Sequence, residues 1–100
     1  MADAMSAQRS AEEMGAESDP QAQLHVKLAE EQLNRAKGLM ASGDNRRAEY
    51  VLVRAKGDAE LALALARAAS AKVEARRAIE RATALQSQNQ NDPNMQGAPQ

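Results

Sequence analysis

A seam of small residues along one helical stretch is the feature that most constrains how this sequence can fold. From about residue 44 to residue 86 the pattern is helical without a break, and small or apolar residues recur every three or four positions. The seam consists of Ala48, Leu52, Ala55, Ala59, Ala62, Ala66, Ala69 and Val73. Because alanine side chains are short, this seam lets a neighbouring helix approach closely. The sequence therefore predicts helix packed on helix.

The composition narrows the class of protein further. The chain has 100 residues and no Cys, Phe or Trp, and Tyr50 is its only aromatic residue. A domain of this size buries a thin core, and each alanine adds little apolar area to it. We therefore expect an all-α fold of modest stability rather than a compact α/β enzyme.

Two shorter helices are predicted before the long one. Residues 2–14 form the first, and Gly15 after it suits a left-handed C-terminal cap. Residues 20–41 form the second, since Ser18 or Asp19 can cap it and a proline occupies its first turn. The apolar face of this second helix approaches half of its circumference, which indicates contact with two neighbours.

The third helix, about residues 44–86, follows a turn at Gly43 that is short enough to force an antiparallel hairpin. At 1.5 Å per residue it would be roughly 65 Å long, so it must overhang the shorter second helix. The polar segment 87–100 contains two prolines and is predicted to be a disordered tail or linker. A single helical domain is thus expected over residues 1–86.

The place of the first helix decides the architecture, and two packings compete. The short connection around Gly15 and the wide apolar face of the second helix favour a three-helix bundle with a long, overhanging third helix. In the alternative, the first helix lies along the overhang, with Ala7 close to Ile79. A close approach of these two residues within one chain would exclude the bundle.

Beyond Val73 the apolar stripe of the third helix moves to a different face. A helix that overhangs its neighbours needs either the first helix or another molecule to cover such a stripe. The predicted interaction surface, for a protein partner or for a second copy, consists of Ala71, Ala75, Ala78, Ile79, Ala82 and Leu85.

No group of residues in the sequence points to catalysis, a cofactor or a metal. His25 is the only histidine and has no carboxylates at ligand spacing, which favours a partly buried packing role. Glu30 and Glu31 are adjacent, so on a helix they point about 100° apart and cannot act as facing carboxylates. We expect no enzymatic activity, no cofactor and no metal ion.

Charge and hydropathy exclude two further classes of partner. The formal net charge is −1, the basic residues of segment 67–81 are spread around the helix, and no aromatic residue there can stack on bases. Nucleic-acid binding is therefore not expected. No apolar run approaches the ~20 residues of a membrane span. The predicted i,i+4 ion pairs are Glu31 with Arg35, Arg54 with Asp58, Lys56 with Glu60, and Arg76 with Glu80.

Residues 24–67, LHVKLAEEQLNRAKGLMASGDNRRAEYVLVRAKGDAELALALAR, resemble the bacterial domain-of-unknown-function family 4398 (DUF4398). The resemblance rests on the Leu-x-x-x-Leu-Ala-Glu-Glu opening at Leu24, the Gly43-Asp44 turn and the block Asp58-Ala59-Glu60-Leu61-Ala62. With the upstream AEEMGAESDPQAQ it covers about residues 8–75. It implies a small helical domain of envelope proteins, often exported as lipoproteins and sometimes joined to a peptidoglycan-binding OmpA-like domain, with no established activity.

Two functions follow as expectations. The first is a non-catalytic helical scaffold or interaction module of the bacterial cell envelope, on its periplasmic side, with a lipid anchor carried by an N-terminal segment ahead of Met1. The second is a cytosolic adaptor whose hairpin resembles a lone tetratricopeptide unit. Its groove, near Leu24, Leu28 and Leu61, would hold a peptide or a partner helix.

Overall fold

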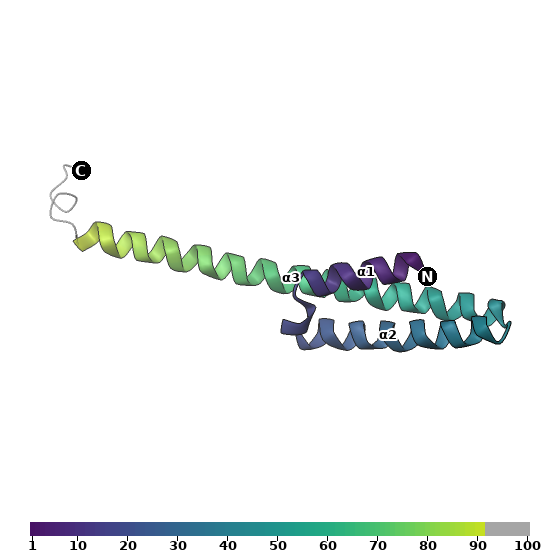
Figure 1. Cartoon of the computed structure of the whole chain (residues 1–100). Helices are drawn as coiled ribbons and strands as arrows, with labels where there is room; N and C mark the ends of the chain where they lie inside the picture. Colours follow the sequence, from purple (N-terminus) through teal and green to yellow (C-terminus); the bar gives the residue numbers. More distant parts are fainter. Residues whose placement is uncertain (92–100) are drawn as a thin grey trace. The chain divides into compact units, whose positions relative to one another are not determined.

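A computed structural model of the chain describes residues 1–91, and these are almost entirely helical. The elements in chain order are α1 (Ala2–Glu13), one turn of 3-10 helix (Ala16–Ser18), α2 (Pro20–Ala41) and α3 (Asn45–Asn91). Figure 1 shows α2 and the first part of α3 as an antiparallel hairpin. The described residues contain no strand, so the predicted all-α fold is confirmed.

The helix ends follow the local signals in the sequence. Asp19 caps α2, since its carboxylate accepts a hydrogen bond from the Ala22 backbone N–H at 2.9 Å. Gly15 and Gly43, with φ of 88° and 84°, provide the left-handed residues in the two connections. Asp44 then precedes α3, and its carboxylate accepts from the Arg47 backbone N–H at 3.3 Å. Of the two residues predicted as possible caps of α2, Ser18 and Asp19, it is Asp19 that caps the helix.

The chain divides into two compact units, Met1–Ser70 and a second that begins at Ala71. The first unit is a three-helix bundle made of α1, α2 and the part of α3 before Ala71. The described part of the second unit is the remainder of α3, up to Asn91. The sequence predicted one domain over residues 1–86, with a change of stripe near Val73, so the division lies close to that change.

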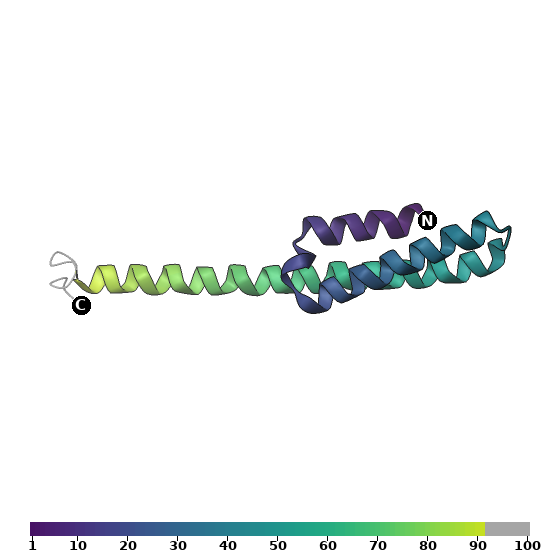
Figure 2. The ribbon, with the colours of Figure 1, turned by 60° about the horizontal axis from the view of Figure 1, so that its bottom comes forward.

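Alanine dominates the core of the first unit. Ala11 of α1 clusters with Ala22 and Val26 of α2 and with Ala62 and Ala66 of α3. A second cluster joins Ala4, Leu33 and Ala55, and a third joins Ala36, Ala48 and Val51. Figures 1 and 2 show α1 running alongside the hairpin. This packing confirms the three-helix bundle and rules out the alternative in which the first helix lies along the overhang of the third.

The buried alanines of the hairpin repeat every seven residues. Those of α2 are Ala22, Ala29 and Ala36, and those of α3 are Ala48, Ala55 and Ala62, with Ala59 and Ala66 between and after them. A seven-residue repeat is typical of helices that wind around each other with interlocking side chains. The sequence seam is therefore a coiled-coil-like interface built from small residues, and its buried part ends at Ala66.

The C-terminal end of α3 differs from its prediction. The helix continues to Asn91, so the boundary expected at residue 86 is five residues too early. Segment 87–91 is polar, but it contains neither Gly nor Pro, and a polar composition alone does not stop a helix. The remainder of the predicted tail, residues 92–100, lies outside the described residues.

Candidate functional site

The described residues contain no centre that suggests metal chemistry. Among residues 1–91, no group of three or more His, Cys, Asp or Glu side chains is placed to hold a metal ion. No helix in this range is long and apolar enough to cross a membrane.

One polar contact joins the two helices of the hairpin. His25 Nδ1 of α2 lies 2.9 Å from Asp58 Oδ1 of α3, and the side chains are 24% and 21% exposed. The sequence predicted a packing role for His25 and an ion pair of Asp58 with Arg54. His25 is indeed partly buried, but Asp58 contacts His25 instead, because the antiparallel register places them side by side.

We expect His25 and Asp58 to be energetically coupled. A hydrogen bond of this kind contributes about 1 kcal/mol, because protein groups replace water as partners. Urea unfolding of His25→Ala, Asp58→Ala and the double variant should give a coupling free energy of this size. Glu60→Ala is the control, since Glu60 is an exposed acid two residues away on α3, where it points to a different side of the helix. Strictly additive losses would contradict the assignment of this bond to stability.

Exposed polar contacts also hold α1 to the hairpin. Gln8 Nε2 donates to Glu30 Oε1 of α2 at 3.0 Å. Lys56 Nζ of α3 lies 3.8 Å from Asp3 and 3.9 Å from Glu60, and the latter is one of the predicted i,i+4 pairs. No other predicted pair comes within 4.0 Å among the residues described. Each such exposed contact contributes little stability. The buried alanine contacts of α1 are therefore what mainly holds it to the hairpin.

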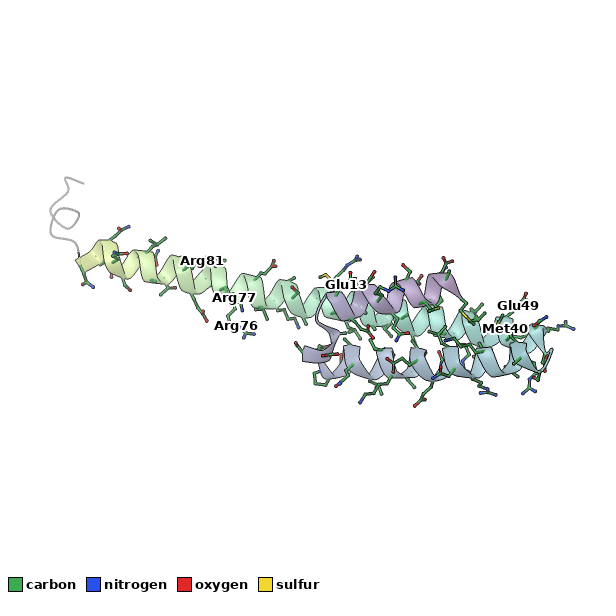
Figure 3. The ribbon with its side chains drawn as sticks, in the orientation of Figure 1. Glu13, Met40, Glu49, Arg76, Arg77 and Arg81 are labelled. Carbon is green, nitrogen blue, oxygen red and sulfur yellow. The ribbon has the colours of Figure 1, made fainter. Side chains whose placement is uncertain are left out.

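The predicted interaction surface lies in the second unit. All residues from Ala71 to Asn91 are exposed, and the two largest apolar side chains, Ile79 and Leu85, are 67% and 61% exposed. This segment carries four basic and two acidic residues, and three of the former, Arg76, Arg77 and Arg81, are marked in Figure 3. The stripe is thus exposed and bordered by charges.

The leucines predicted for the adaptor groove lie on the hairpin of the first unit. Leu24 and Leu61 are exposed and Leu28 is half-buried. Since Leu28 and Leu61 each lie one turn beyond the bonded pair His25 and Asp58, they share one flank of the hairpin.

The described residues thus define an alanine-packed, all-α helical domain. The family described as a domain of unknown function (DUF4398) matches residues 1–78. The chain belongs to this family, which confirms the resemblance found in its sequence motifs. Searches of curated proteins and of solved structures found no match.

Proposed function

We propose that this chain is a non-catalytic interaction module of the bacterial cell envelope, and that segment 71–86 associates with a second copy of itself. The observation that carries the proposal is the exposed apolar stripe on this helical segment. An exposed stripe of this length is costly in water and favours a partner that buries it. The proposed role requires neither a cofactor nor enzymatic activity.

The spacing of the stripe supports pairing of two helices. Its members at 71, 75, 78, 82 and 85 alternate steps of four and three residues, which is the heptad pattern of coiled coils. Four of these five are alanines, as in the buried seam between α2 and α3. That seam is antiparallel, so this chain already uses alanine faces to join antiparallel helices.

Charges specify one antiparallel register. If Ala75 lies opposite Ala78 of the second copy, then Ala71 lies opposite Ala82, and Glu74 lies beside Arg81 of the second copy. The two-fold axis repeats this ion pair between Arg81 of the first copy and Glu74 of the second. A parallel pair would place Glu74 next to Ile79 instead, so the charges favour the antiparallel dimer.

The envelope setting is supported by membership of the family, which the sequence resemblance associates with exported lipoproteins. Under this proposal an N-terminal segment ahead of Met1 carries a lipid anchor, and the bundle is held on the periplasmic side of the envelope. Self-association of segment 71–86 would then join anchored copies. Fractionation of cells that express the full-length gene product tests this setting, and recovery in the cytosol would contradict it.

Exchanging the charges of Glu74 and Arg81 tests the proposed dimer. Glu74→Arg should weaken self-association roughly tenfold, since it replaces both ion pairs of the interface by pairs of arginines. Adding Arg81→Glu in the same chain should restore it, because the exchange recreates both pairs. Glu80→Arg is the matched control, because it makes the same change of charge at an exposed position outside the stripe. Sedimentation velocity over a wide concentration range measures the effect.

A strict monomer at every concentration would contradict the proposal. Failure of the double exchange to restore association would contradict the register. Ala75→Glu and Ile79→Glu extend the test to the stripe itself, since a charge at either position should abolish association without unfolding the bundle.

A further inference from the structure

A groove on one flank of the hairpin is lined by arginines. Two cavities of about 200 and 230 Å³ share Arg35 of α2 and Val51 and Arg54 of α3. Arg47 and Tyr50 line the first cavity as well. Since both cavities have Val51 and two arginines in common, they form one continuous groove with an apolar floor and a basic rim.

The basic rim is not neutralised by the chain itself. Arg35 and Arg54 have no carboxylate within 4.0 Å among residues 1–91, although Glu31 also lines the groove. Arg47 contacts only Asp44, at 3.7 Å. Guanidinium groups bind carboxylates through two parallel hydrogen bonds, which makes arginine well suited to recognise acidic side chains.

Gln32 lines the same groove. Its Oε1 is shielded from solvent, so this atom lies beneath the groove surface and does not face a ligand. The apolar floor at Val51 favours a ligand that brings apolar side chains together with carboxylates. A peptide brings both, whereas an inorganic anion brings charge alone.

We propose that this groove binds an acidic helical segment of another protein, whose carboxylates bond Arg47 and Arg54 of the rim while its apolar side chains cover Val51. Arg47 and Arg54 are seven residues apart, so they lie on one face about 10 Å apart along α3. Two acidic residues at the same spacing on a partner helix would match them.

A second copy does not supply this spacing. In the sequence only Glu12 and Asp19 are acidic residues seven positions apart, and Asp19 is occupied as the cap of α2. The occupant is therefore a different protein. The groove lies on residues of the first unit and does not depend on the self-association proposed for segment 71–86.

Fluorescence anisotropy tests the proposal with the full chain. The probe is a labelled alanine-leucine helical peptide with two glutamates seven residues apart, and the reference peptide has glutamines in their place. Arg54→Gln and Arg47→Gln should each weaken binding of the glutamate peptide about tenfold. Arg67→Gln should leave it unchanged, because this exposed α3 arginine does not line the groove and the substitution removes the same charge.

Equal binding of the glutamine peptide, or an equal loss in Arg67→Gln, would overturn the proposal. Displacement of the peptide by inorganic phosphate, at an ionic strength where chloride has no effect, would also overturn it by showing a general anion site.

Discussion

Ala62→Leu is expected to destabilise the bundle by about 3 kcal/mol, as typical for extra carbon atoms forced into a close-packed core. Ala62 is fully buried among Ala11 of α1, Ala22 and Val26 of α2, and Ala66 of α3. A leucine there must push three helices apart at once. Since small domains have only a few kcal/mol of stability in total, this change alone should unfold much of the population near room temperature.

Urea denaturation followed by circular dichroism measures this loss. Ala64→Leu is the matched control, because Ala64 is exposed on the same helix two residues later. It should change the unfolding free energy by less than about 0.5 kcal/mol. Equal stability of the two variants would mean that the helices are not held together at alanine contacts.

Leu33→Ala is expected to lower the unfolding free energy by about 3 kcal/mol. Leu33 is only 5% exposed and is the one large side chain in a cluster whose other buried members are Ala4 and Ala55. Its truncation leaves a cavity that neighbouring alanines cannot fill, since their side chains have no further atoms to move into it.

Leu24→Ala serves as the control for this loss. Leu24 belongs to the same helix but is largely exposed, so its truncation should cost less than about 1 kcal/mol. Thermal or urea unfolding of the two variants gives the comparison. A loss for Leu24→Ala as large as that for Leu33→Ala would show that the leucine flank of the hairpin is also covered by a neighbour.

The helices and their ends could be predicted because the relevant signals are local. Asp19 with the proline after it, and the glycines at 15 and 43, act on residues only a few positions away. The seam was also readable, since Ala48, Ala55 and the alanines after them repeat with helical period and are buried up to Ala66. Periodicity identifies which face of a helix is apolar, but it does not identify the neighbour that covers it. Both packings of α1 are therefore compatible with the sequence pattern, and the burial of Ala4 and Ala11 in the core distinguishes them.

The polar contacts depend on register, which a single helix does not reveal. His25 and Asp58 are 33 residues apart, and their pairing follows only when the two arms of the hairpin are aligned. The sequence does contain a signal for this pairing, because His25 and Asp58 are nearly equidistant from the turn at Gly43. The arginine groove depends on the same alignment of the two helices, since Arg35 belongs to α2 and Arg54 to α3.

Hydrogen exchange of backbone amides at low and high protein concentration tests the central claim most directly, namely that an alanine-packed bundle is joined to a self-associating segment. The account predicts strong protection over Ala48–Ala66 at both concentrations. Segment 71–86 should exchange rapidly in dilute solution and become protected as the protein is concentrated. Exchange in this segment that is independent of concentration, or rapid exchange over Ala48–Ala66, would contradict it.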